Sequence, residues 1–324
     1  MNDSLGVLVV GAGDMGTRHA LHWTAAGAKV VAVCDPDVKR AQASADVCAA
    51  LVGADYREWL TRDDINVVSV CTPTFLHAPI TIDGLNAGKH VLCEKPIALT
   101  LEDARAMKNA AETNDRELRI GFMRRFDPSY PVLLGQLDAI GGPVLGRVTV
   151  TAGIRPKRLM HAKNANGGPV IDMCCHLFDM WKRMFEASPR LVHVAGHTYG
   201  ADKPQLAGIK DKAVESAAIT LQYGANTVQL LITWGLPEGV LFREKHVYVG
   251  PGGLVEASWD YLTNPAELST GAGVTRFESG RDPWAAEIRQ FYKELTEGAE
   301  RQVADADDGV EALELSLQVL EAVA

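Results

Sequence analysis

The chain has 324 residues, of which 47% are hydrophobic and 23% charged, so it carries enough apolar surface for more than one hydrophobic core. Its formal net charge of −9 argues against nucleic acid and against anionic membrane surfaces as partners. No apolar run approaches the length of a membrane span, and the first predicted strand begins too near residue 1 to leave room for a signal peptide, so we expect a cytoplasmic protein.

The first 120 residues alternate between strand-like and helix-like segments. Short, β-branched, non-alternating apolar runs are typical of strands buried on both faces, and they occur at 7–10, 30–34, 67–71, 91–93 and 118–122. Helical segments lie between them, at 15–26, 36–50 and 79–87, with a further helix opening at Thr100. This alternation predicts a doubly wound parallel sheet over residues 1–122.

The pattern changes after residue 122. Strand-like segments follow one another at 144–153, 190–196, 213–223, 227–235, 245–250 and 254–259. Helices are predicted near 128–140, 171–186, 283–297 and 308–323. These segments predict an α+β domain over residues 123–324, built on a large, mixed, mostly antiparallel sheet with one open face.

The six cysteines occur without any paired Cys-x-x-Cys spacing. We therefore expect free, mostly buried thiols in a reducing compartment rather than a disulfide framework. Cys34, Cys71 and Cys93 fall at the ends of predicted strands, where they could line a cofactor crevice without taking part in chemistry.

A glycine-rich turn follows the first predicted strand and opens the first helix. It is Gly11-Ala-Gly13-Asp14-Met15-Gly16. In such a turn, Gly11 permits the tight bend, Gly13 lets the backbone approach a pyrophosphate, and Gly16 lets helix and strand pack closely. We expect the whole turn, including Asp14 and Met15, to contact a dinucleotide.

Asp35 stands at the tip of the second predicted strand, nineteen residues after Gly16. A carboxylate in that position accepts hydrogen bonds from the adenosine ribose and repels a 2′-phosphate, so NAD is favoured over NADP. Lys39 and Arg40 leave NADP open as an alternative, because either could reach a phosphate if the loop bends.

Lys95 follows the short apolar run that ends in Cys93 and Glu94. A lysine at the carboxyl end of a parallel strand faces the crevice in which a dinucleotide lies. Its ammonium could hydrogen-bond a substrate hydroxyl and stabilise alkoxide character as hydride leaves. We therefore expect Lys95 to be catalytic and to contact both cofactor and substrate.

Asp172 and His176 are four residues apart in the helix predicted for 171–186, so they share a face. An imidazole beside a carboxylate suits proton removal from an alcohol. Two other interpretations stay open: the pair could only stabilise the helix, or it could bind a metal together with Cys175. The second lacks a convincing third ligand, so we expect no metal.

Four motifs together resemble a known family. They are the turn Gly11–Gly16, Cys71-Thr72-Pro73-Thr74-Phe75-Leu76-His77, Ala87-Gly88-Lys89-His90-Val91-Leu92-Cys93-Glu94-Lys95-Pro96 and Gly168-Pro169-Val170-Ile171-Asp172-Met173-Cys174-Cys175-His176. In this order they resemble the glucose–fructose oxidoreductase / inositol dehydrogenase (Gfo/Idh/MocA) family, and the resemblance spans both predicted domains. Residues 121–127 most resemble inositol dehydrogenases. The resemblance implies a Rossmann domain followed by a large mixed sheet, often used for oligomerisation. We therefore expect residues 1–122 to be an NAD(P)-binding Rossmann domain and residues 123–324 to be a substrate-binding and oligomerisation domain.

The resemblance also implies roles for individual residues. It gives His176 the general acid/base role and Asp172 an orienting, substrate-binding role, and it implies a cis Lys95–Pro96 bond. Glu94 is expected to hydrogen-bond the cofactor ribose. The remaining expected cofactor contacts are Thr72, Pro73 and His77, although His77 could instead only cap a helix.

Several polar residues are candidate substrate contacts in the second half. Arg124 and Arg125 are two, one of which could instead form a domain-interface ion pair. His161, Asn164 and Asn166 could contact sugar hydroxyls. Residues 155–164 do not match the inositol dehydrogenase pattern, which puts inositol in doubt as the substrate.

The sequence thus predicts an NAD-dependent dehydrogenase that oxidises a secondary hydroxyl of a sugar, polyol or cyclitol, as a homodimer or homotetramer. Three alternatives stay open: an NADP-dependent keto- or anhydro-sugar reductase, a redox-neutral NAD-dependent glycosidase, and a regulator that binds nucleotide without turnover.

Overall fold

The computed structural model describes residues 5–155, 157–198, 203–260, 264–270, 273–277 and 282–323. Its contacts divide the chain into two compact units. Unit 1 consists of Met1–Phe126 and Asp282–Leu313, and unit 2 of Asp127–Arg281 and Glu314–Ala324. None of the helices in the described part of the chain is long and apolar enough to cross a membrane.

Unit 1 contains a six-stranded parallel sheet with the strand order β3-β2-β1-β4-β5-β6. Its strands are β1 (Gly6–Val10), β2 (Lys29–Cys34), β3 (Leu51–Gly53), β4 (Val67–Val70), β5 (His90–Glu94) and β6 (Leu118–Gly121). Its helices are α1 (Asp14–Ala26), α2 (Val38–Asp46), α3 (Arg57–Leu60), α4 (His77–Asn86), α5 (Leu101–Asn114), α9 (Pro283–Glu297) and the first part of α10 (Ala306–Val323).

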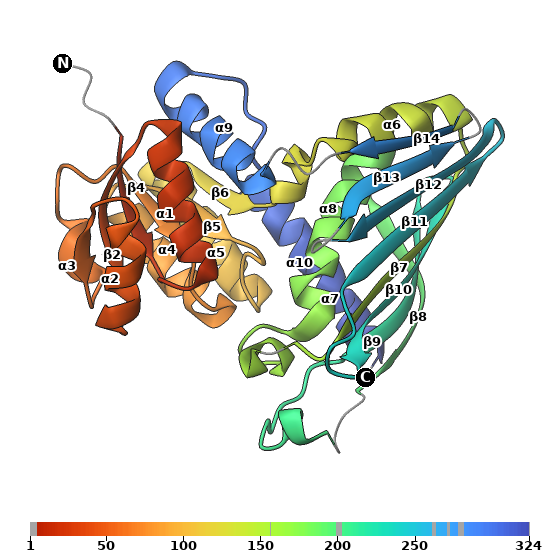
Figure 1. Cartoon of the computed structure of the whole chain (residues 1–324), viewed down its shortest axis with the longest axis horizontal. Coiled ribbons are helices and arrows are strands. Elements are labelled where there is room, and N and C mark those ends of the chain that lie inside the picture. The colour runs from red at the N-terminus through yellow and green to blue at the C-terminus, as the bar shows by residue number, and fades with distance from the viewer. Residues whose placement is uncertain are drawn as a thin grey trace. The chain divides into compact units, whose positions relative to one another are not determined.

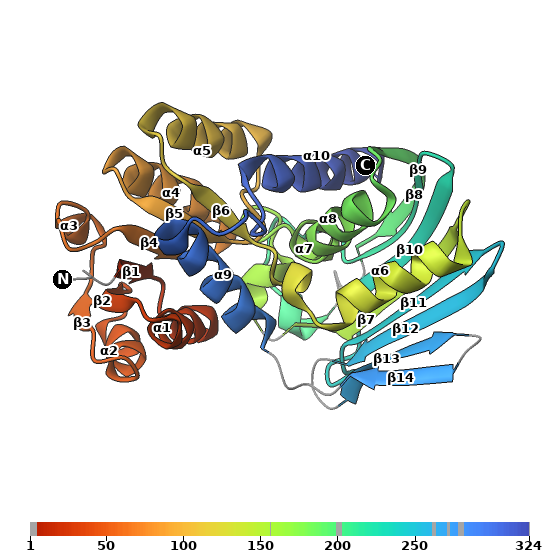
Figure 2. The ribbon, with the colours of Figure 1, turned by 90° about the horizontal axis from the view of Figure 1, so that it is seen from above.

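The central strands of this sheet are covered on both faces. Every residue of β1 and β4 is buried, which explains why their apolar runs do not alternate. Figures 1 and 2 show α1 and α2 on one face of the sheet and α4 and α5 on the other. The predicted doubly wound Rossmann sheet is confirmed.

Helix α9 belongs to unit 1 although its residues come late in the chain. Trp23 of α1 packs against Phe291 of α9 with ring centroids 6.1 Å apart, and both side chains are fully buried. Unit 1 also contains residues 123–126 and 282–313, which we expected in the second domain. The difference arises because the covering of α1 by α9 is a long-range contact that no local pattern reveals.

Unit 2 contains an eight-stranded sheet with the order β14-β13-β12-β11-β7-β10-β9-β8. Its strands are β7 (Leu145–Gly153), β8 (Pro189–His197), β9 (Ser216–Tyr223), β10 (Asn226–Leu236), β11 (Arg243–Gly250), β12 (Gly253–Asp260), β13 (Asn264–Thr270) and β14 (Gly273–Phe277). The pair β7–β10 is parallel and the other described pairs are antiparallel. This confirms the predicted mixed sheet, to which the structure adds β13 and β14.

Helices α6 (Ser129–Ile140), α7 (Gly168–Asp172) and α8 (Cys174–Phe185) lie on one face of this sheet (Figure 1). Their apolar side chains pack on inward-facing strand residues such as Val150 of β7 and Ile232 of β10. Figure 2 shows no described helix on the opposite face, so the sheet is open there, as predicted.

The helix predicted for residues 171–186 is interrupted. α7 ends at Asp172, and α8 begins at Cys174 after a break at Met173. The helical spacing of apolar residues continues through this break, because Val170 of α7 and Leu177 of α8 are both fully buried in the same core. The predicted placement of Asp172 and His176 on one continuous helix is therefore wrong: they flank a junction between two helices.

Candidate active site

Two glycines of the turn are required by packing within unit 1. Gly11 has a φ of +97°, and a Cβ there would lie 2.5 Å from the carbonyl oxygen of Cys71. A Cβ on Gly16 would lie 1.7 Å from the carbonyl oxygen of Gly11. Both positions therefore need glycine whether or not a nucleotide binds.

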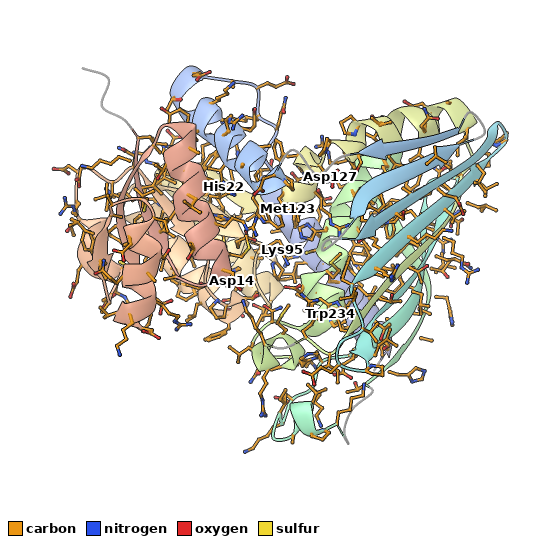
Figure 3. All side chains as sticks on the ribbon, in the orientation of Figure 1. Asp14, His22, Lys95, Met123, Asp127 and Trp234 are labelled. Atoms are coloured by element: carbon orange, nitrogen blue, oxygen red, sulfur yellow. The ribbon has the colours of Figure 1, made fainter. Side chains whose placement is uncertain are left out.

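Gly13 differs, because the protein itself does not require a glycine there. Its φ of −76° is open to any residue, and an added Cβ would meet no atom within 4 Å among the described residues. A glycine that leaves space beside a helix N-terminus is what close approach of a phosphate requires. Asp14 is exposed in the first turn of α1 (Figure 3), and Met15 is half-buried beside it.

Asp35 is buried at the end of β2 and is held by backbone donors. Its Oδ2 accepts a 2.9 Å hydrogen bond from the N–H of Ala12 in the glycine turn, and its Oδ1 accepts one of 2.9 Å from Asp37. The Arg40 guanidinium lies 3.2 Å from both the Asp35 and Asp37 carboxylates. The hydrogen bond from Ala12 therefore fixes the glycine turn against Asp35. The charge of Arg40 is balanced by the carboxylates of Asp35 and Asp37.

The loop after β4 contains a further polar atom suited to a ligand. Thr72 Oγ1 is buried and has no hydrogen-bond partner in the described part of the chain. A buried hydroxyl without a partner is costly unless a ligand or water completes it. Pro73 follows Thr72 and precedes a short 3₁₀ helix, Thr74–Leu76. Together with the space beside Gly13, this hydroxyl fits a nucleotide at the carboxyl edge of the sheet.

His77 fastens this loop to the segment after Lys95. Its Nδ1 lies 2.8 Å from the carbonyl oxygen of Pro96, and its Nε2 lies 3.0 Å from that of Thr72. Burial lowers the pKa of His77, although the two carbonyls favour the protonated ring. Both ring nitrogens therefore contact backbone carbonyls outside α4, so the His77 side chain neither caps that helix nor leaves a ring nitrogen directed at a nicotinamide.

Lys95 follows β5, and Figure 3 shows its place in unit 1. Its bond to Pro96 is cis, as the resemblance implied. The Lys95 N–H donates a 3.1 Å hydrogen bond to Oε2 of Glu94, so the acid fixes the backbone from which the lysine side chain extends.

Glu94 belongs to a buried chain of polar groups. Its Oε1 lies 3.0 Å from His19 Nε2, and His19 Nδ1 lies 2.9 Å from Ser69 Oγ. Trp23 Nε1 donates to the same Ser69 hydroxyl at 3.1 Å. Burial would raise the pKa of Glu94, but the His19 hydrogen bond and the positive charge of Lys95 outweigh it and lower that pKa. Both Glu94 oxygens thus have partners within the protein. The expected contact with the cofactor ribose did not include these two interactions.

Arg124 and Arg125 lie in unit 1, in the short 3₁₀ helix Met123–Phe126 that follows β6. Arg125 forms an ion pair with Asp308 at 2.8 Å and also approaches the carbonyl of Gln302. Arg124 is buried. Arg125 therefore forms an ion pair within unit 1, not the expected domain-interface pair, and Arg124 stays a candidate substrate contact.

In unit 2, Asp172 and His176 are both buried at the junction of α7 and α8. Asn166 Nδ2 donates a 2.8 Å hydrogen bond to Asp172 Oδ1, which orients the carboxylate. Asn164 is exposed two residues earlier. His161 is buried, with Nε2 at the backbone of Arg155 and Nδ1 3.4 Å from Glu215, so its ring faces protein.

Some of these residues were not found from sequence. His19 gave no signal, because a histidine inside an amphipathic helix has no local motif. Asn166 was named only as a possible sugar contact, whereas the structure bonds it to Asp172. No cluster of three or more metal-ligating side chains occurs within the described residues.

The cysteines at the strand ends are neutral thiols. All six cysteines of the chain are free. Burial raises the pKa of the Cys34 thiol to about 12 and raises that of Cys93 well above its usual range. A thiol that stays protonated is a poor nucleophile, in agreement with cysteines that do no chemistry.

The N-terminal part of the chain matches a family model. Residues 5–122 match the model described as an oxidoreductase family with an NAD-binding Rossmann fold. Over 151 residues the chain is 38% identical to an inositol 2-dehydrogenase from Rubrobacter xylanophilus, which covers 45% of this chain and 44% of that protein. The matched region thus spans less than half of that relative.

Two solved structures match nearly the whole chain. A predicted myo-inositol dehydrogenase from Sinorhizobium meliloti 1021 is 28% identical, with a TM-score of 0.80, over 99% of this chain and 97% of that one. GenD2 from gentamicin A biosynthesis, solved in complex with NAD, is 24% identical, with a TM-score of 0.84, over 99% and 94%. At that identity the likeness to GenD2 shows the fold alone.

Proposed function

Because the chain belongs to the Gfo/Idh/MocA oxidoreductase family, we propose that it is an NAD-dependent dehydrogenase that oxidises a secondary hydroxyl of a sugar, polyol or cyclitol. The inositol 2-dehydrogenase named among its relatives supports this substrate class. The free thiols are in keeping with a cytoplasmic location, which is part of the proposal.

NAD, when bound, supplies the hydride acceptor. The residues that would hold it are the turn Gly11–Gly16, Asp35 and Thr72. The open space beside Gly13 and the buried Thr72 hydroxyl support this assignment. Asp35 and Asp37 place two carboxylates at the end of β2 against one guanidinium, Arg40, which supports NAD over NADP.

The observation that carries the proposal is the fixed position of Lys95. Its backbone is bonded to Glu94 at the carboxyl end of β5, the strand edge at which a Rossmann sheet binds its ligand. We assign the Lys95 ammonium to the reacting hydroxyl, where it stabilises negative charge on the oxygen.

His176 is the proposed general base that takes the hydroxyl proton, and Asp172 orients the substrate. Asn166 holds the Asp172 carboxylate, which limits its motion and prepares it to accept hydrogen bonds from substrate hydroxyls. An imidazole is suited to this role near neutral pH.

The test is a panel of sugars, polyols and cyclitols with purified protein, monitored for NADH at mildly alkaline pH. We expect at least one substrate to reduce NAD, and Lys95→Ala to lower turnover about 100-fold or more with NAD affinity unchanged. Turnover of Lys95→Ala within tenfold of the parent would refute the mechanism. Tightly bound NAD without net NADH would favour a redox-neutral glycosidase instead.

Arg40 favours a second candidate, an NADP-dependent sugar reductase. Its side chain is mostly exposed next to Asp35, so it could turn toward a 2′-phosphate. Side-by-side titrations with NAD and NADP decide between the two, because the reductase requires tighter NADP binding.

We also propose that the open face of the unit 2 sheet pairs with a second copy of the chain. Leu145, Val249 and Leu254 are exposed, and they lie opposite one another on β7, β11 and β12. An exposed apolar row across three neighbouring strands is typical of an oligomer interface. Light scattering of the parent and of Val249→Lys would test this, since the charge should shift a dimer or tetramer toward monomer.

A further inference from the structure

Arg155 of unit 2 has no carboxylate partner among the residues that the structure describes. It lies two residues after β7, and its guanidinium carbon is 5.7 Å from the ring centroid of Trp234. Its Nε is buried and has no hydrogen-bond acceptor within the described ranges. Those residues also place no carboxylate at ion-pair distance from it. A buried guanidinium donor without an acceptor costs free energy unless a ligand or water completes it.

The position of Arg155 is fixed. The backbone N–H of Arg155 lies 3.0 Å from His161 Nε2, and its carbonyl oxygen lies 3.1 Å from the same atom. Trp234, labelled in Figure 3, packs edge-on against His161 with centroids 6.5 Å apart. Trp234 Nε1 is a second buried donor for which the described residues provide no acceptor. Two unsatisfied donors thus occur in one packed cluster.

Glu215 is a buried acid that contacts the same cluster through His161. Glu215 is fully buried, and its Oε1 lies 3.4 Å from His161 Nδ1. Its charge therefore faces the imidazole, and no ion pair joins it to Arg155 in the described structure. The positive charge of Arg155 is not cancelled within the cluster.

The surrounding segments are also basic. Residues 155–163 contain four Lys or Arg and no acid, and residues 203–212 contain three Lys and one Asp, in a chain whose net charge is −9. Backbone hydrogen bonds tie the first segment to the residues at the end of the second, from Lys163 N–H to Asp211 and from Ala213 N–H to His161. The local excess of positive charge therefore opposes the sign of the whole molecule.

This basic region is continuous with the loop that holds Asp172. Asn166 N–H donates to the carbonyl of Ala162, the residue after His161, and Asn166 Nδ2 donates to Asp172. The described residues 157–166 thus lie between the unmatched arginine and the carboxylate assigned above to substrate orientation.

We propose that Arg155 binds an anionic group of the substrate, so that the preferred substrate is a sugar or polyol derivative bearing a carboxylate or a phosphate. The inference rests on the proposed function, which it narrows to an anionic substrate class. A guanidinium pairs with either anion through two parallel N–H donors, and a flat aromatic platform such as Trp234 leaves its edge free for that contact. A neutral cyclitol would leave the buried Nε without its acceptor.

The test compares three matched sets of substrates: neutral hexoses and cyclitols, the corresponding uronates, and hexose 6-phosphates. We expect one anionic set to exceed the neutral set about tenfold or more in kcat/KM. Arg155→Met should remove that preference by raising KM for the anion about ten- to 100-fold while changing kcat/KM for the neutral set much less. Arg155→Lys should retain part of it, because a lysine keeps the charge but loses the paired donors.

Arg158→Met is the matched control. Arg158 lies in the same basic segment, but its guanidinium donates to the backbone carbonyl of Ala207. We expect this variant to keep the anion preference. An equal loss in both variants would point to general electrostatic attraction and would overturn the specific role of Arg155.

The outcomes separate this inference from the proposed function. Turnover of neutral substrates, with Arg155→Met indistinguishable from the parent on anions, overturns the anion site and leaves the dehydrogenase intact. Absence of NADH with every substrate overturns the dehydrogenase. Calorimetric titration of glucuronate, glucose 6-phosphate and inorganic phosphate then tests the site directly, and binding that is equal in parent and Arg155→Met rejects it. NAD affinity and Tm of each variant report whether it is folded.

Discussion

The imidazole of His19 joins the glycine-turn helix to the strand that carries Lys95: its Nε2 lies 3.0 Å from Oε1 of Glu94. Trp23 can only donate to Ser69, so the Ser69 hydroxyl is free to donate to His19 Nδ1 and His19 Nε2–H to donate to the Glu94 carboxylate. The other Glu94 oxygen receives the Lys95 N–H. This buried chain fixes the start of the lysine segment from inside the sheet.

We predict that His19→Phe lowers turnover about ten- to 100-fold, because Glu94 loses the donor that holds it under Lys95. NAD affinity should change much less, since His19 is not among the residues assigned to the cofactor. The same change should cost about 1–3 kcal/mol of unfolding free energy, because it leaves a buried carboxylate oxygen without a donor. Steady-state kinetics and urea denaturation measure the two effects.

Ser69→Ala is the control for this prediction. It removes the hydroxyl between Trp23 and His19 but keeps the His19–Glu94 contact. It should be destabilised yet retain most of its turnover. If both variants lose stability equally and neither loses turnover, His19 has only a structural role.

The two glycines of the turn should respond differently to the same methyl group. Gly13→Ala should fold with nearly parental stability, because its Cβ meets no described atom within 4 Å, but should bind NAD roughly tenfold or more weakly. Gly16→Ala should instead lose stability by about 1–3 kcal/mol, because its Cβ would overlap the Gly11 carbonyl. Calorimetric NAD titration and thermal unfolding of both variants separate binding from folding. A stable Gly13→Ala protein with unchanged NAD affinity would contradict the assigned phosphate site.

Cofactor choice should depend on the acid at the end of β2. Asp35→Asn removes the charge but keeps an oxygen that can accept from Ala12 N–H. We predict that it shifts the ratio of NADP to NAD affinity about tenfold toward NADP, because the repulsion of the 2′-phosphate disappears. Arg40→Ala should weaken NADP binding and leave NAD binding unchanged. If the parent protein binds NADP more tightly than NAD, the assignment of Asp35 as the residue that favours NAD is wrong.

Acid should destabilise the fold through His77. Burial lowers the pKa of His77 below the ordinary histidine value of 6.5, so the unfolded chain binds the proton more readily than the folded one. Its contribution to stability is therefore complete above pH 6.5 and is lost as the pH falls through the lower, folded pKa. The slope is at most about 1.4 kcal/mol per pH unit for each such group.

His77→Asn should reduce the loss of unfolding free energy between pH 7.5 and pH 5.5 without abolishing it. The pKa values of His22 and His90 are also lowered, by burial, and they contribute in the same direction. Urea denaturation at several pH values measures the slope. An identical slope in parent and variant would mean that His77 does not titrate differently on folding.

The Rossmann sheet was predictable because its signals are local. Strands buried on both faces must be apolar at every position, and a turn that bends tightly between strand and helix requires glycine at positions 11 and 16. The packing of α9 on α1 was not predictable, because Trp23 and Phe291 meet only through the tertiary fold. Local patterns determine elements, whereas membership of a unit is decided by distant contacts.

The site residues divide in a similar way. Lys95 and the turn were found through their motifs, and their roles stay proposals. Residue spacing alone did not reveal the break at Met173, because both helices turn apolar residues toward the same core. The partners of Glu94 and the unmatched charge of Arg155 were not predictable from the sequence either. Each depends on which side chains the tertiary fold brings close.

The late position of α9 in the chain also affects how the protein is made. The first segment of unit 1 ends at Phe126, but the helix that covers Trp23 does not begin until Pro283. At typical rates of synthesis, the intervening 156 residues (127–282) take roughly ten to thirty seconds to translate. For that interval the apolar side of α1 lacks its cover, so the nascent chain presents a surface that chaperones recognise. The nucleotide-binding unit, although its sheet is translated first, is among the last parts of the molecule to be completed.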